Sequence, residues 1–141
     1  MVFLLAAQIN LGLQIAILAA LFTGFVLKRR RRYLYHGTVM LAVTVLNVAS
    51  LLAVMGPSLL GLSGTVGEKP LGTVSLFVIA HATIGTVALA LAVWIIATWR
   101  LRSSTERCVK RKKTMRLVMV LWTTAAILGI AVYVLLYVVV T

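Results

Sequence analysis

Four long apolar stretches, none with a charged residue in its interior, constrain this chain more than any other feature. They cover about residues 3–27, 34–55, 74–98 and 116–140. Each supplies the ~20 residues with which an α-helix crosses a hydrocarbon core. In lipid a spanning backbone must also pair its own amides, which favours helices. The sequence therefore predicts an all-α, integral membrane four-helix bundle, with residues 1–141 forming a single transmembrane domain.

The composition excludes an ordinary soluble domain. Hydrophobic residues make up 62% of the 141 residues and charged residues only 11%, whereas a soluble domain carries about 25% charged residues. The single cysteine excludes an intrachain disulfide. Basic residues follow the first stretch and none precedes it. We therefore expect a retained span there and not a cleaved signal peptide.

The basic residues indicate how the chain is oriented. All of the 14 lysines and arginines except Lys69 lie in or beside the segments 28–33 and 99–115. By the positive-inside rule we expect both segments to be cytoplasmic loops of a cell (plasma) membrane protein, N-out/C-out. The segment 56–73 holds both prolines and half of the ten glycines, which predicts an outer loop. The basic runs favour anionic lipid headgroups and no nucleic acid partner.

Polar side chains inside the stretches are the candidates for function. At about 100° per residue, His36, Met40 and Asn47 share one face of the second stretch. At a rise of about 1.5 Å per residue, His36 lies roughly 3 Å and His81 about 25 Å from the cytoplasmic boundary. The level of His81 also holds a predicted buried polar cluster, consisting of Asn10, Gln14, Asn47 and Tyr133.

The two histidines leave two interpretations open. Their depths differ by about 20 Å, so a single haem takes only one of them. A haem b held by His81 or His36, with Met40 or an open position opposite, agrees with the sequence. Alternatively, His81 hydrogen bonds to the polar cluster or to a carbonyl of another helix, and His36 anchors the chain at the interface. A copper or zinc site needs more ligands than the chain assembles, so we expect none.

The order of these residues resembles a known family. The residues that carry the resemblance are Asn10, Gly24 ahead of the basic turn, His36-Gly-Thr-Val-Met40, His81, Trp122, Gly129 and Tyr133. In order and spacing they resemble the YozB/CtaM-like group, a small prokaryotic four-helix membrane family of unknown function that is linked to biogenesis of haem–copper oxidases. The resemblance covers nearly the whole chain and implies a non-enzymatic role in respiratory-complex assembly.

The stock of reactive side chains also favours a protein that is not an enzyme. The chain has two histidines and two acidic residues, and they form no recognisable acid–base pair. We expect an accessory subunit or assembly factor of a respiratory, haem–copper oxidase-type complex. Its partners are the lipid bilayer and other membrane subunits or a second copy of the chain. The alternative is a haem b-binding membrane electron carrier. A solute carrier ranks last, because the stretches lack the charges and breaks typical of transporters.

Overall fold

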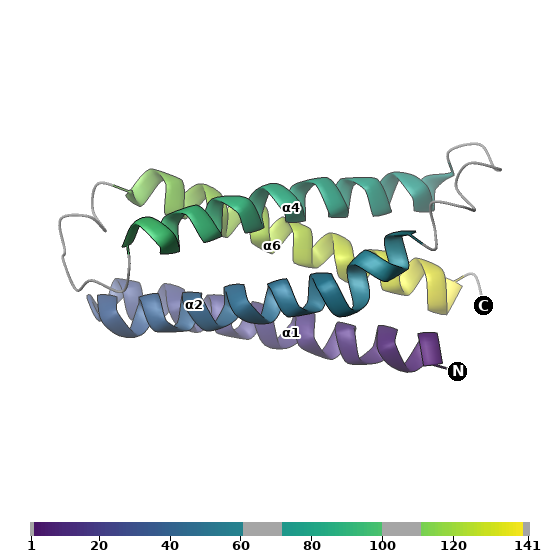
Figure 1. Ribbon diagram of the computed structural model, residues 1–141, viewed down its shortest axis with the longest axis horizontal. Helices are drawn as coiled ribbons and strands as arrows, with labels where there is room; N and C mark the ends of the chain where they lie inside the picture. The colour runs from purple at the N-terminus through teal and green to yellow at the C-terminus, as the bar shows by residue number, and fades with distance from the viewer. Residues whose placement is uncertain (1, 61–71, 100–110, 140–141) are drawn as a thin grey trace.

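The chain folds into an antiparallel bundle of four long helices (Figure 1), seen in a computed structural model that describes residues 2–60, 72–99 and 111–139. The helices are α1 (Val2–Arg29), α2 (Tyr33–Ser50), α4 (Thr73–Trp99) and α6 (Lys112–Val134). Each belongs to a segment that is long and apolar enough to cross a membrane. The predicted all-α, four-helix architecture is confirmed.

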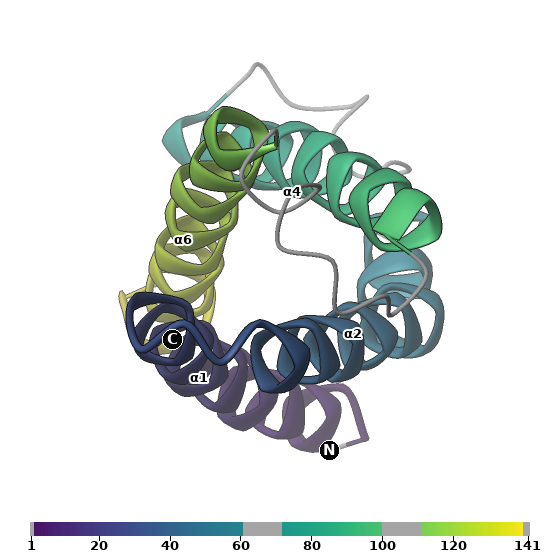
Figure 2. The ribbon, with the colours of Figure 1, turned by 90° about the vertical axis from the view of Figure 1, so that its left-hand side faces the viewer.

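The helices surround a common axis in the order α1, α2, α4, α6 (Figure 2). Helices α1 and α2 pack closely as one hairpin, and α4 and α6 pack closely as another, whereas α2 and α4 touch at fewer places. Helices α2 and α6 therefore lie diagonally across the bundle. The turn after α1 and the start of α6 share one end, and both chain termini lie at the other (Figure 1). The basic residues that flank these elements are thus gathered at one end.

A tight, strained turn connects α1 to α2. The amide of Arg32 donates to the carbonyl of Leu27 and the amide of Arg31 donates to that of Lys28. This pair of bonds is the Schellman motif, whose penultimate residue is left-handed and usually glycine. Here Arg31 occupies that position with φ of 59°. Arg31 therefore has a strained backbone conformation in this turn.

The helical segment that begins with α2 continues past its predicted end at residue 55, into the segment expected to be an outer loop. Pro57 lacks an amide hydrogen and its ring clashes with the carbonyl four residues earlier, so a regular α-helix cannot pass through it. The chain instead forms a π-helical turn, η1 (Leu51–Met55), in which the amide of Gly56 donates to the carbonyl of Leu51. A Cβ at Gly56 would lie 2.9 Å from that carbonyl oxygen, so the turn needs glycine. Helical structure then runs to residue 60.

The last helix also differs from its predicted bounds. It begins at Lys112, inside the predicted loop 99–115, because basic side chains are compatible with helix outside the apolar span. Its far end passes into a second π-helical turn, η2 (Leu135–Val139). Residues 61–71 and 100–110 of the two longer predicted loops lie outside the described residues.

The middle of the bundle is a small apolar core. Its buried residues come from all four helices: Ile17, Leu21, Val43, Ala88, Ala92, Ile95, Val118 and Trp122. Threonines on the outer faces are paired locally, as Thr38 and Thr83 show by donating to carbonyls four residues earlier. Such pairing is needed where no water is available. Among the described residues, one buried side-chain atom has no hydrogen-bond partner, Nε2 of Gln14.

Candidate functional site: two histidine cavities

Two cavities lie along the axis of the bundle, and each contains one histidine. The basic cavity has a volume of about 680 Å³ and is lined by His36. The His81 cavity has a volume of about 260 Å³ and lies toward the end that holds the chain termini. Trp122 lines both and is only 3% exposed, so it forms the wall between them. The two histidines consequently belong to separate sites, as their predicted depths require.

His36 is fixed by a neighbouring helix. Its Nδ1 lies 2.7 Å from the carbonyl oxygen of Gly24 in α1. A carbonyl only accepts, so Nδ1 carries the hydrogen and Nε2 keeps its lone pair. A histidine ligand of a metal has this same arrangement, with one ring nitrogen hydrogen-bonded to the protein and the other at the metal. His36 is half-buried and lines the basic cavity. One interpretation of the sequence made His36 an anchor at the membrane interface; its place in the cavity wall also lets it contact a molecule bound there.

The mouth of the basic cavity is strongly positive. Five basic side chains line it: Lys28, Arg29, Arg31, Lys112 and Arg116. The only two acidic residues of the chain, Glu68 and Glu106, are outside the described residues. The guanidinium of Arg29 also lies 5.8 Å from the centre of the Phe25 ring, which keeps it beside the apolar wall. The cavity therefore combines an apolar interior with a cationic rim.

Methionine side chains, whose thioether sulfurs can bind a metal ion, also line this cavity. Met40 lines it one turn beyond His36, and its terminal methyl contacts Gly24, where an added Cβ would overlap that methyl. Met119 lines it from α6, the helix diagonally opposite α2. A thioether on the opposite helix can face a ligand held by His36 across the bundle, whereas Met40 projects from the same helix as His36. Depth along the helices also puts Met119 near the level of His36, but the sequence-based set of candidate ligands contained only Met40.

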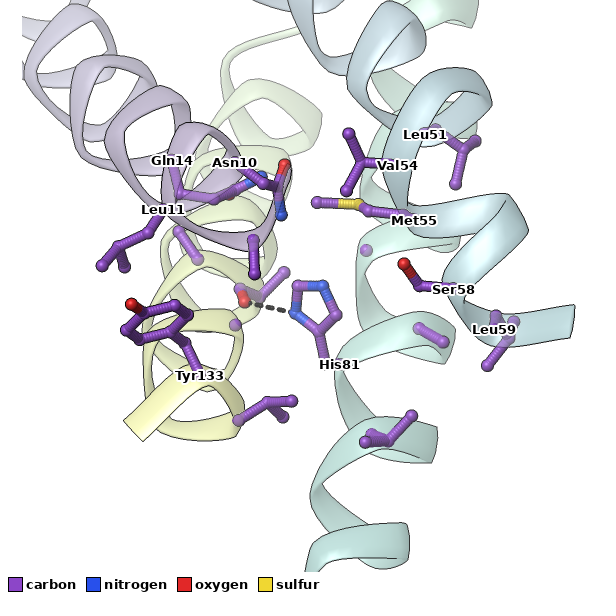
Figure 3. A pocket seen from close by; sticks show the side chains of 18 of the residues that line it. Asn10, Leu11, Gln14, Leu51, Val54, Met55, Ser58, Leu59, His81 and Tyr133 are labelled. Atoms are coloured by element: carbon purple, nitrogen blue, oxygen red, sulfur yellow. Dashed lines mark hydrogen bonds between the residues drawn. The ribbon is translucent and has the colours of Figure 1, made fainter. Parts of the chain in front are cut away.

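His81 is fixed in the same way as His36. Its Nδ1 lies 2.7 Å from the carbonyl oxygen of Ala125 in α6 (Figure 3). The ring also lies directly against Gly129, where an added Cβ would be 2.8 Å from Cε1 of His81. Of the alternatives weighed for His81, the backbone carbonyl of another helix is the one observed. The side chains of the polar cluster are not the partner of Nδ1, because Gly129 lets the ring approach the backbone of α6.

The residues of the predicted polar cluster all line the His81 cavity: Asn10, Gln14, Asn47 and Tyr133. Asn10 accepts a 2.6 Å hydrogen bond from the hydroxyl of Ser50, which ties α1 to α2. Gln14 is 5% exposed and its Nε2 is unpaired. Tyr133 stacks beside Tyr137 with ring centres 5.1 Å apart. Its hydroxyl points away from His81 (Figure 3).

The sequence reasoning allowed a carbonyl partner for His81 without identifying its residue, and it named no hydrogen-bond partner within the chain for His36. Gly24 and Gly129 were noted as part of a pattern, but a carbonyl acceptor has no side-chain signature. The only available signal is a small residue on a facing helix at the depth of each histidine, which permits close approach. Within residues 2–60, 72–99 and 111–139, no group of three or more histidine, cysteine or acidic residues suits a metal ion. A porphyrin-held metal with one histidine remains compatible with the basic cavity.

No protein-family model, no curated protein and no solved structure matches this chain.

Proposed function

We propose that this chain is a non-enzymatic membrane protein that binds haem b in the basic cavity. The observation that carries the proposal is His36, which lines a cavity of about 680 Å³ and whose Nδ1 is held by Gly24, so that the free lone pair is on Nε2. His36 would hold the haem iron, and Met119 is the candidate for a second iron ligand. The cationic rim suits the two carboxylates of haem, since charge-assisted hydrogen bonds are the strong ones. Bound haem b supplies a one-electron carrier.

The size of the cavities supports His36 over His81 as the ligand. A cavity near 150 Å³ holds about one benzene ring, so the 260 Å³ around His81 is too small for a porphyrin of four pyrrole rings. The basic cavity is more than twice as large and has the cationic rim that the His81 cavity lacks. Of the two histidines proposed from the sequence, the geometry therefore favours His36.

We further propose that the protein serves a respiratory, haem–copper oxidase-type complex as an accessory subunit or assembly factor in a prokaryotic plasma membrane. The resemblance to the YozB/CtaM-like group supports this role, and a haem-holding bundle fits it. Large apolar side chains on the outer helix faces, such as Phe22, Leu52 and Leu76, are available to lipid and to partner helices. The basic end would face the cytoplasm.

The test is a reduced-minus-oxidised absorption spectrum of the purified protein after haem addition. We expect a Soret band and sharp visible bands in the wild type and in His81→Gln, and their loss in His36→Gln. The Met119→Leu variant should keep haem but shift its bands, because one residue that would hold the iron is lost. A spectrum that disappears in His81→Gln and survives in His36→Gln would refute the assignment. In the source organism, deletion of the gene should lower the amount of assembled oxidase, and His36→Gln should not restore it.

A further inference from the structure

The His81 cavity contains a polar atom whose partner is missing. Nε2 of Gln14 is buried and unpaired, although Asn10 and His81, which line the same cavity, are hydrogen-bonded. An unpaired amide in an apolar medium costs several kcal/mol. A buried unsatisfied donor in a native structure therefore calls for an explanation, of which a bound ligand is one. This donor lines a cavity, so a molecule in that cavity can supply the missing acceptor.

The same cavity also offers an acceptor. Because Nδ1 of His81 donates to Ala125, its Nε2 is left with a lone pair. In Figure 3 the ring edge away from Ala125 faces the part of the cavity formed by Asn10 and Met55. The cavity thus presents one buried amide donor and one imidazole acceptor. A hydroxyl is a group that both accepts and donates, and it complements this pair.

The remaining wall fits one aromatic ring. Apart from the polar groups, the lining is mostly aliphatic and aromatic, including Met55, Trp122 and Tyr133. A volume of about 260 Å³ exceeds the ~150 Å³ that holds benzene and admits a single substituted ring. Leu59 and Thr86 line the cavity and are also exposed on the outside of the bundle, beside α2 and α4. The cavity is therefore open to the lipid, through which a long apolar tail could leave.

We propose that the His81 cavity binds the ring of an isoprenoid quinol. A ring hydroxyl donates to Nε2 of His81, and a ring oxygen accepts from Nε2 of Gln14. The tail lies in the lipid between α2 and α4. This inference does not rest on haem in the basic cavity, because the two lining sets share only Trp122.

Isothermal titration calorimetry in detergent tests the proposal, with trimethylhydroquinone as a one-ring probe kept reduced. Wild type should bind it saturably, one molecule per chain. Gln14→Leu should weaken binding about tenfold, the value of one well-placed hydrogen bond. Gln8→Leu is the matched control, because Gln8 is exposed on the same helix outside both cavities, and it should bind like wild type. The dimethyl ether of the probe, which has no hydroxyl to donate to His81, should also bind about tenfold more weakly.

The stability of Gln14→Leu without ligand separates a binding role from a structural one. Removing an unpaired buried amide should leave the ligand-free protein at least as resistant to unfolding as wild type. A Gln14→Leu protein that unfolds more easily would show that Gln14 has a structural partner, and the proposal would fall. It would fall equally if wild type bound no quinol, if Gln14→Leu bound as tightly as wild type, or if the ether bound as tightly as the quinol. None of these results depends on whether haem is present.

Discussion

Replacing Gly129 by alanine should destabilise the bundle by about 2 kcal/mol. The new Cβ would lie 2.8 Å from Cε1 and 3.2 Å from Nδ1 of His81, so the ring must move. Crowding a packed site typically costs about 1–3 kcal/mol, and loss of the bond from His81 to Ala125 adds about 1 kcal/mol. The better helix propensity of alanine returns up to about 1 kcal/mol.

The free energy of unfolding is measured by titrating detergent-solubilised protein with dodecyl sulfate and following helix content. Gly85→Ala and Gly12→Ala are the controls. A Cβ at Gly85 would be 3.8 Å from Cβ of Ala125, an ordinary contact, and one at Gly12 would meet no atom within 4 Å. Both variants should be neutral or slightly stabilised.

A double-mutant cycle isolates the clash. In a His81→Ala background the ring is gone, so Gly129→Ala should cost nothing or stabilise slightly. The coupling between the two sites should then be about 2–3 kcal/mol, at the upper end for residues in contact. The reasoning is refuted if Gly129→Ala is as mild as Gly85→Ala, or if its cost is unchanged when His81 is alanine.

Three further predictions concern the basic end of the bundle. Gly24→Ala should cost about 1 kcal/mol or less in the same unfolding assay, because the atom it meets is the flexible end of Met40; a cost matching Gly129→Ala would contradict this. Arg31→Gly should stabilise the protein by about 1 kcal/mol by relieving the left-handed backbone, yet weaken haem binding in a titration. If the basic segments are cytoplasmic, a membrane-impermeant thiol reagent should not label Cys108 in intact cells, and strong labelling would reverse the proposed orientation.

At the His81 cavity, the sequence predicts the depth of the lining residues but not their hydrogen-bond partners. Helical depth alone brings Asn10, Gln14, Asn47 and His81 to one level, because the rise per residue is fixed. Depth does not say which of these side chains pair. That outcome depends on how each helix is rotated about its axis and on where small residues such as Gly129 let a ring reach a neighbouring backbone.

The four long apolar helices and the clustering of positive charge at alternate connections between them follow from the amino-acid sequence alone. Long apolar stretches in lipid have few alternatives to the helix, since every backbone amide must be paired within the span. The carbonyl partners of both histidines and the unpaired amide of Gln14 arise only when the helices pack together. These features depend on contacts between helices, and a carbonyl acceptor or a cavity is created only when separate segments pack together.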